Sequence, residues 1–144
     1  MKVSVRLTEG LKEPYAVIYA GGLDDEVRRA AELLTAAGAP VVAESEDRLI
    51  VLKPGEIYMI RVENGTTVIY GEKRSYRSRK RLYELEEELG AGFMRVAKSV
   101  VVNLAHLDSV EAGFSGTMLL KLKNGCKDYV SRKYLPEFKR YLNL

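Results

Sequence analysis

The chain has few of the residues that build disulfides, metal centres or membrane spans. Its 144 residues include one cysteine, Cys126, one histidine, His106, and no tryptophan. A single cysteine excludes an intrachain disulfide, and two possible ligands so far apart make no zinc-binding cluster. No run approaches the roughly 18 apolar residues that span a bilayer, and the first residues lack the apolar core of a signal peptide. We therefore expect a cytoplasmic protein with no stable membrane insertion, no metal and no cofactor.

Motifs for catalysis are also missing. An enzyme needs a nucleophile, a base and an orienting partner, but no recognisable motif surrounds Cys126 or His106. Cys126 is expected to be a small core residue and His106 to be structural. Gly21-Gly22 precedes a predicted helix as a phosphate loop would, but no Gly-Lys-Ser/Thr follows, and the acidic run from Asp24 would repel phosphate. The sequence therefore predicts neither an enzyme nor a nucleotide-binding protein.

The net charge of +3 conceals an asymmetry along the chain. Residues 1–52 carry six Lys or Arg and nine Asp or Glu, whereas residues 53–144 carry seventeen and eleven. A basic part behind an acidic one indicates a nucleic-acid-binding domain joined to a part with another task. On charge alone, a solvated charged surface remains the alternative.

The patterns of the acidic part predict a small α+β module. Apolar and polar residues alternate over 3–7, and a second apolar run covers 15–20, so we expect a pair of strands. Asp24 can cap a helix over 25–37, which ends near Gly38. A further strand is expected at 49–52. A module of this size is near the lower limit for independent folding, so it should pack on a partner or on the next domain.

The turn Lys53-Pro54-Gly55 marks the predicted boundary between the module, residues 1–52, and a mainly β domain with short helices, residues 53–144. The expected elements are strands at 57–62 and 67–70 joined by Asn64-Gly65, a helix over 79–89 capped by Ser78, strands from Val100 and Leu107, strands over 117–122 and 126–130 joined by Asn124-Gly125, and a closing helical segment from Ser131 with Pro136 near its regular start.

Two short motifs stand out in the basic part. The first combines Phe93, Arg95 and Ser99 with the pair Val102-Asn103. The second is Tyr-Val-Ser-Arg-Lys-Tyr-Leu at 129–135, which follows an Asn-Gly turn and a short strand. With these motifs, residues 53–144 resemble the LytTR family of bacterial transcriptional regulators. The resemblance implies a mainly β domain that inserts loop side chains, not a recognition helix, into successive major grooves of double-stranded DNA.

The resemblance also bears on the first part of the chain. Many LytTR proteins carry a receiver domain, which needs about a hundred residues or more, and only about fifty precede the matching region here. The chain therefore resembles short LytTR regulators without a receiver, and phosphorylation of Asp24 or Asp25 is not expected. For residues 1–52 we expect dimerisation or a regulatory role, although the apolar stripe of the helix could equally pack within the chain.

Two residues are expected to contact bases. Lys98 lies where the family inserts a loop side chain into the major groove, and a lysine can donate to guanine O6 or N7. Family members often have histidine or asparagine in this stretch, whereas Ala97 stands beside Lys98 here, so Lys98 could contact phosphate instead. Arg132 matches the family's C-terminal base-contacting arginine, and its planar fork can bind guanine bidentately.

Other residues are expected to contact phosphate. The stretch 73–81, called the basic cluster below, has six cations in nine positions with hydroxyl groups between them. Some of its cations should pair with the glutamates that follow. The residues predicted to contact phosphate are Arg77, Arg79, Lys80, Arg95, Ser99, Ser131 and Lys133; for Ser99, a hydroxyl that only satisfies backbone groups is an equal alternative.

The sequence thus predicts a sequence-specific regulator that binds double-stranded DNA as a homodimer and has no catalytic activity. A basic β-rich RNA-binding module is one alternative, if the tyrosines form an exposed stacking platform. A ligand-sensing or protein-interaction module without nucleic-acid binding is the other.

Overall fold

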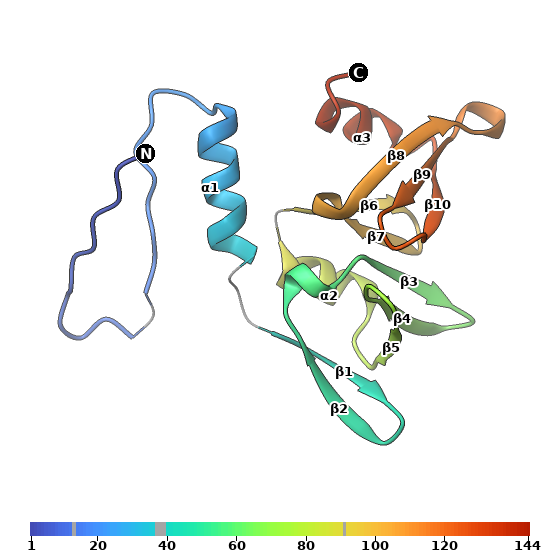
Figure 1. The fold of residues 1–144 in the computed structure, drawn as a ribbon, viewed down its shortest axis with the longest axis horizontal. Coiled ribbons are helices and arrows are strands. Elements are labelled where there is room, and N and C mark those ends of the chain that lie inside the picture. Colours follow the sequence, from blue (N-terminus) through green and yellow to red (C-terminus); the bar gives the residue numbers. More distant parts are fainter. Residues whose placement is uncertain (13, 37–39, 91) are drawn as a thin grey trace.

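Two antiparallel sheets form the body of the molecule in a computed structural model, which describes residues 1–12, 14–36, 40–90 and 92–144 (Figure 1). The larger sheet has seven strands in the order β2-β1-β5-β4-β3-β7-β6, and the smaller has three in the order β10-β9-β8. The strands are β1 (Val41–Ser45), β2 (Arg48–Leu52), β3 (Met59–Glu63), β4 (Thr66–Tyr70), β5 (Ser75–Ser78), β6 (Phe93–Ala97), β7 (Val100–Asn103), β8 (Leu107–Ala112), β9 (Met118–Leu122) and β10 (Lys127–Val130). The helices are α1 (Asp25–Ala36), α2 (Leu82–Leu89) and α3 (Leu135–Tyr141). The predicted mainly β architecture is confirmed, and none of the described helices is long and apolar enough to span a membrane.

Turn chemistry sets the register of the hairpins. Asn64 and Gly65 have φ values of 50° and 78°, the left-handed conformation of a tight two-residue hairpin turn. They join β3 to β4 with Glu63 opposite Thr66, as the sequence predicted. Asn124 shapes the β9–β10 turn, since its Oδ1 accepts from the Cys126 N–H at 3.0 Å.

The strand β7 is buried at all four positions because both of its faces are covered. Val101 contributes to one core cluster with the α2 face formed by Leu82, Leu85 and Leu89. Val100 and Val102 point into a second cluster with residues of β9 and β10 and with Phe138 of α3. The seven-stranded sheet is thus packed between α2 on one face and the three-stranded sheet with α3 on the other.

The β1–β2 hairpin belongs to the same sheet as the strands that follow it. It lies before the predicted boundary at Lys53, but β1 pairs with β5 through Glu44 and Arg77. Val41, Ala43 and Leu52 of this hairpin are buried in the cluster with α2. The role in dimerisation or regulation expected for residues 1–52 therefore concerns only the residues that precede β1.

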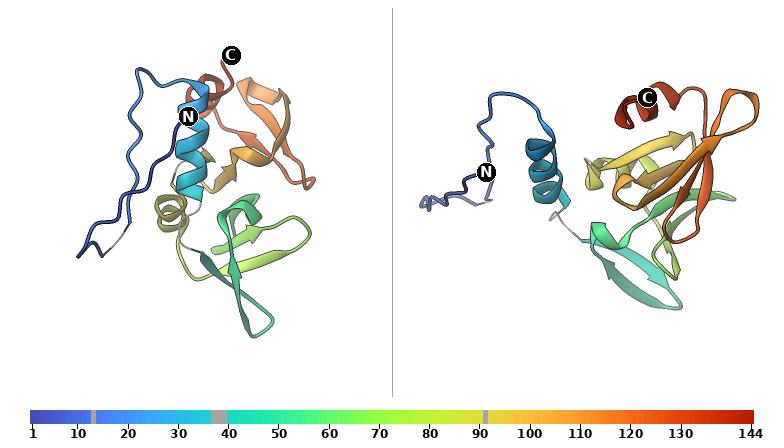
Figure 2. Two further views of the ribbon diagram at one scale, coloured as in Figure 1. Left: turned by 60° about the vertical axis from the view of Figure 1, so that its left-hand side comes forward. Right: turned by 45° about the horizontal axis from the view of Figure 1, so that its top comes forward.

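The expected pair of strands at 3–7 and 15–20 is wrong, because the described residues 1–12 and 14–24 contain no strand. An isolated two-stranded hairpin is marginal without a covering layer, and no described element supplies one here. The helix α1 does start as predicted, with Asp24 Oδ1 accepting from the Val27 N–H at 2.9 Å. Its expected end at Gly38 lies outside the described residues. Figure 2 shows this N-terminal part standing apart from the two sheets.

The sequence also missed strands β1, β5 and β6 and placed the start of α2 too early. Ser78 ends β5, where it lies opposite Thr67, so it cannot cap the helix. Its Oγ instead accepts from the Lys80 N–H at 3.1 Å. The helix α2 begins at Leu82, and Glu84 accepts from the Arg81 N–H at 3.2 Å. At the C-terminus, α3 starts at Leu135 with Pro136 in its first turn, as predicted.

Candidate nucleic-acid interface

Three turns meet at one end of the seven-stranded sheet. The pairings Glu63–Thr66, Thr67–Ser78 and Arg61–Val100 place the β3–β4 turn, the end of β5 and the β6–β7 turn at this end. The β6–β7 turn consists of Lys98 and Ser99. Lys98 is exposed, whereas the Ser99 carbonyl accepts from the Val62 N–H at 2.9 Å and so anchors the turn to β3.

The segment after β10 is attached next to this turn. The Ser131 N–H donates to the Val96 carbonyl at 2.9 Å, two residues before Lys98 along β6. The following residue is Arg132, which is exposed. The structure therefore brings the two predicted base-contacting residues onto adjoining turns, although 34 positions separate them in the sequence. No described acidic residue forms an ion pair with Lys98 or Arg132.

The loop between β8 and β9 supports Arg132. Gly116 has a φ of 78°, and a Cβ atom at this position would lie 3.5 Å from Cδ of Arg132. The methylene part of Arg132 thus lies along the loop. Thr117 fixes the loop by donating from its Oγ1 to the Phe114 carbonyl at 2.6 Å. These contacts restrict the arginine stem before any ligand is present.

Arg95 is held by partners within the chain. Its Nε and Nη2 lie 3.0 and 2.8 Å from Glu86 Oε2 on α2, and its Nη1 donates to the Lys98 carbonyl at 2.8 Å. The side chain is only 21% exposed. This predicted phosphate-contacting residue therefore links α2 to the β6–β7 turn.

The basic cluster begins just before β5, runs through this strand and ends at Arg81, the N-cap residue of α2, so its last residues lie at a helix N-terminus as the sequence predicted. Arg77 is exposed on β5, Arg79 Nε lies 2.7 Å from Glu44 Oε1, and Lys80 pairs with Glu88 of α2. Four strand spacings of about 4.8 Å separate β5 from β6, or about 19 Å. This separation exceeds the roughly 12 Å width of a major groove.

The two remaining predicted phosphate contacts lie around the start of α3. Ser131 is half-buried, and its carbonyl accepts from the N–H groups of Tyr134 and Leu135, both at 3.0 Å. Lys133 is exposed, with its ammonium 5.4 Å from the centre of the Tyr134 ring. Both residues are therefore held close to Arg132.

An exposed aromatic pair beside Arg132 was not predicted. Phe114 of the β8–β9 loop and Tyr129 of β10 have ring centres 4.8 Å apart in an edge-to-face arrangement. Val130 pairs with Met118, so the loop and Arg132 share one end of the three-stranded sheet. Gly113 and Gly116 around Phe114 signal a turn in the sequence, but they do not indicate what it approaches.

Arg61, by contrast, is occupied in joining the two sheets. It donates to Glu63 at 2.9 Å, to Asp128 of β10 at 3.0 Å and to the Tyr70 hydroxyl at 3.2 Å. Burial alone would lower the pKa of Arg61, but the hydrogen bonds with Tyr70, Asp128 and Glu63 outweigh it and raise the pKa. The hydrogen bond from Tyr70 lowers the pKa of Glu63. Arg61 is therefore a fixed, charged structural residue.

The second half of the Phe93–Asn103 motif is structural. Asn103 is buried, donates to the Ile57 carbonyl at 2.9 Å and accepts from the Ala105 N–H at 3.1 Å. His106 stacks on Tyr58 with ring centres 3.7 Å apart, and its Nε2 lies 2.7 Å from the Gly55 carbonyl. These contacts agree with the structural role predicted for His106.

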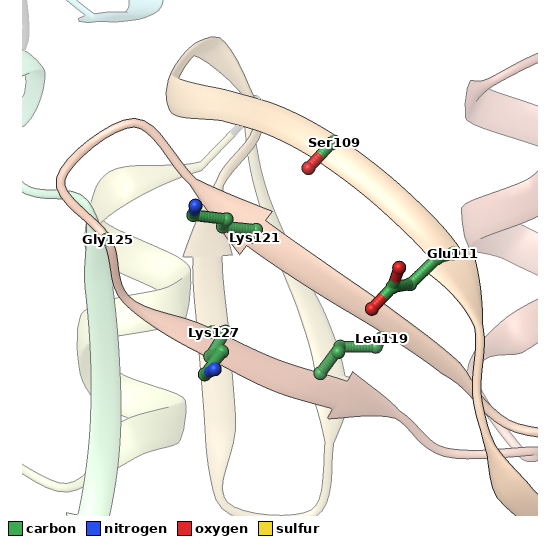
Figure 3. Close-up of a pocket in the computed structure, with 6 residues that line it drawn as sticks. All are labelled: Ser109, Glu111, Leu119, Lys121, Gly125 and Lys127. Carbon is green, nitrogen blue, oxygen red and sulfur yellow. The ribbon is translucent and has the colours of Figure 1, made fainter.

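A depression of about 500 Å³ lies on the outer face of the three-stranded sheet (Figure 3). It is lined by Ser109, Glu111, Leu119, Lys121, Gly125 and Lys127. Lys121 and Lys127 are opposite each other in the β9–β10 pair. None of the residues predicted to contact DNA lines it.

Residues 47–143 match the family model of the LytTr DNA-binding domain. The chain belongs to the LytTR family. It is 31% identical over 102 residues to the sensory transduction protein LytT of Enterococcus faecalis and to the transcriptional regulatory protein LytR of Staphylococcus aureus strain MW2. Each match covers 70% of this chain but only 42% of the relative, so the chain spans about two fifths of these curated relatives.

A solved structure has the same fold. It is described as the LytTr DNA-binding domain of a putative methyl-accepting/DNA response regulator from Bacillus cereus, and it superimposes with a TM-score of 0.69 at 23% identity. The match covers 74% of this chain and 98% of that one. Membership of the family and the LytTR-like fold predicted from the sequence are thus confirmed.

Proposed function

We propose that this chain is a sequence-specific transcriptional regulator that binds double-stranded DNA and places the β6–β7 turn and the turn after β10 in the major groove. The observation that carries the proposal is the hydrogen bond between Ser131 and Val96, because it sets Lys98 and Arg132 side by side as exposed cations without ion-pair partners among the described residues. The names of the LytR and LytT relatives and of the Bacillus cereus domain support it. Acting on chromosomal DNA would place the protein in the cytoplasm.

The proposed roles follow the chemistry of each side chain. Arg132 reads guanine through its bidentate fork, and Lys98 donates to a base edge or a nearby phosphate. Further phosphate contacts are assigned to Arg77, Ser99, Ser131 and Lys133, which form no ion pair with described residues, and to Arg79, Lys80 and Arg95, which do. The last three must exchange a carboxylate for a phosphate, so each should contribute less.

Selection of bound fragments from genomic DNA by the purified protein, followed by a salt series on the selected duplex, tests the proposal. With roughly four phosphate contacts, the logarithm of the affinity should fall with the logarithm of salt with a slope near −4, at about −0.9 per contact. Lys121→Gln is the matched control and should leave the slope unchanged, because Lys121 lies on the outer face of the three-stranded sheet at a depression that no predicted DNA contact lines. Salt-independent binding, or preference for single-stranded RNA in competition, would exclude the proposal.

We also propose that the protein acts as a homodimer and that the residues before β1 mediate the association. A dimer would present two reading units to half-sites about one helical turn apart, roughly 34–36 Å. The exposure of apolar side chains before β1 supports this assignment.

A further inference from the structure

The N-terminal arm, residues 2–7, has the sequence pattern of a strand but no strand partner among the described residues. Val3, Val5 and Leu7 are 85%, 81% and 95% exposed and alternate with Lys2, Ser4 and Arg6. This period of two would place the three apolar side chains on one face of an extended chain. Covering such a face with another surface removes its apolar side chains from water and is therefore favourable.

Two tyrosines that follow the arm in the sequence are also exposed. Tyr15 and Tyr19 are 77% and 94% exposed. Since an aromatic side chain buries about 150–250 Å² when covered, the two tyrosines leave about 250–430 Å² open. Together with the apolar residues of the arm, they leave a large apolar area exposed to water before α1. Covering part of this area would stabilise an association.

A second uncovered surface lies at the outer edge of the seven-stranded sheet. The strand β2 is the last in the sheet order, so its outer backbone groups have no strand partner among the described residues. Leu49 and Val51 are 70% and 62% exposed, and Val42, directly opposite Val51, is 50% exposed. Figure 1 shows this hairpin projecting away from the three-stranded sheet, which lies over the opposite part of the seven-stranded sheet. Apart from Arg48, β2 lacks the charges, prolines and bulges that protect edge strands.

We propose that the arm of one copy of this chain pairs as an added strand with the β2 edge of a second copy, and that the second copy does the same in return. The backbone of the arm would satisfy the open edge, and its apolar face would cover Leu49 and Val51. Charge complementarity supports a second copy as the partner. Residues 1–8 carry two basic side chains and no acidic ones, whereas residues 41–52 carry three acidic side chains and one basic one.

The arm of the same chain is a poorer match for its own β2. In the structure the arm is tied back toward α1, because the N-terminal ammonium lies 2.7 Å from Glu26. Both views in Figure 2 keep it away from the β1–β2 hairpin. In a reciprocal exchange, the arm of each protomer covers the β2 edge of the other, so both arms and both edges are covered. This is the geometry of a two-fold dimer. This pairing rests on the homodimer proposed above and specifies its contacts, and it does not require DNA.

Disulfide trapping between differently sized copies tests this pairing. In a Cys126→Ser background, Val5→Cys protein would be mixed and oxidised with tagged Leu49→Cys protein or tagged Val51→Cys protein. We expect a disulfide-linked heterodimer with at least one of them, since opposed strand residues bring Cβ atoms to about 4.5–5.5 Å, near the 3.5–4.5 Å of a disulfide. Ser4→Cys is the matched control: it is one residue away but faces the opposite side, so it should not link.

Sedimentation without DNA supplies the second measurement. Val5→Asp changes only an exposed residue, so it should weaken dimerisation at least tenfold and leave thermal unfolding of the two sheets unchanged. An unchanged dimer would overturn the pairing, and so would a monomeric wild-type chain at tens of micromolar. A link within a single Val5→Cys, Val51→Cys chain would show that the arm folds onto its own edge. Because DNA is absent, these results are independent of whether the protein binds DNA.

Discussion

Replacing Arg95 by Gln tests whether this side chain supports the β6–β7 turn or contacts phosphate directly. Its guanidinium binds Glu86 and the Lys98 carbonyl at 2.8–3.0 Å. A hydrogen bond from a charged group contributes about 1.5–3 kcal/mol, and an exposed ion pair about 0.2–1 kcal/mol. Because Glu86 is 38% exposed, the low ends of both energy ranges apply. The substitution should therefore lower the free energy of unfolding by about 2 kcal/mol.

Urea denaturation and DNA binding at several salt concentrations measure the two roles separately. With an m-value of about 1–3 kcal/mol/M, the urea midpoint should fall by about 1 M. DNA affinity should fall because the Lys98 turn loses its support, whereas the salt slope should become shallower by much less than the value of about 0.9 for a full phosphate contact. Glu86→Gln is the matched control and should cost less than about 1 kcal/mol, since it leaves the bond to Lys98 intact. The double variant should be less destabilised than the sum of the two single variants.

The opposite result would refute this reasoning about Arg95. If the variant kept the wild-type urea midpoint and its salt slope became shallower by about 0.9, Arg95 would be a phosphate contact that releases Glu86 when DNA binds.

Three further predictions concern base reading, the core and pH. Arg132→Ala should lose about 1–3 kcal/mol on the preferred site and discriminate less against a changed guanine. Lys80→Ala should weaken all duplexes alike, but because Lys80 pairs with Glu88 it should reduce the salt slope by less than the value of about 0.9 for a full contact. Full site preference in the Arg132 variant would disprove base reading. Phe138→Ala should lower the free energy of unfolding by about 3–5 kcal/mol in urea titrations, and a loss below about 1 kcal/mol would contradict its place in the core. Tyr70→Phe removes the hydrogen bond that lowers the pKa of Glu63 and should therefore lower the free energy of unfolding at neutral pH. The difference from the wild type should shrink as the pH falls through that lowered pKa, because protonated Glu63 no longer benefits from the bond. If the difference stayed constant into acid, the result would argue against this contact.

Local patterns were sufficient for many elements of the fold. Asn64-Gly65 can adopt the left-handed turn with little strain, and the spacing of Leu82, Leu85 and Leu89 creates one apolar helix face. These signals need only neighbouring residues. The arm carried an equally clear strand pattern, but a strand also requires a partner, which the pattern does not specify. The strand β5 was missed because its Ser-Tyr-Arg-Ser sequence lies within a run of cations that suggested a helix entrance.

The candidate site could be predicted residue by residue but not as an arrangement. Lys98 and Arg132 were identified from two separate motifs, and the Ser131–Val96 bond that unites them is a tertiary contact with no local signal. For the same reason the sequence did not show that Arg95 would be occupied by Glu86. Cation chemistry indicates what a side chain can bind, whereas its partners within the fold decide whether it is free to do so.

The strand β7 contributes side chains to both core clusters, and this has a consequence for the cooperativity of unfolding. Val101 and its neighbours Val100 and Val102 belong to opposite clusters but to one strand, so neither cluster can open while β7 stays in place. The two halves of the domain should unfold in one transition, with the β7 amides exchanging their hydrogens only through global unfolding. Because Lys98 and Ser99 lead directly into β7, a ligand that orders this turn should raise the protection of amides beside α2 as well as beside α3.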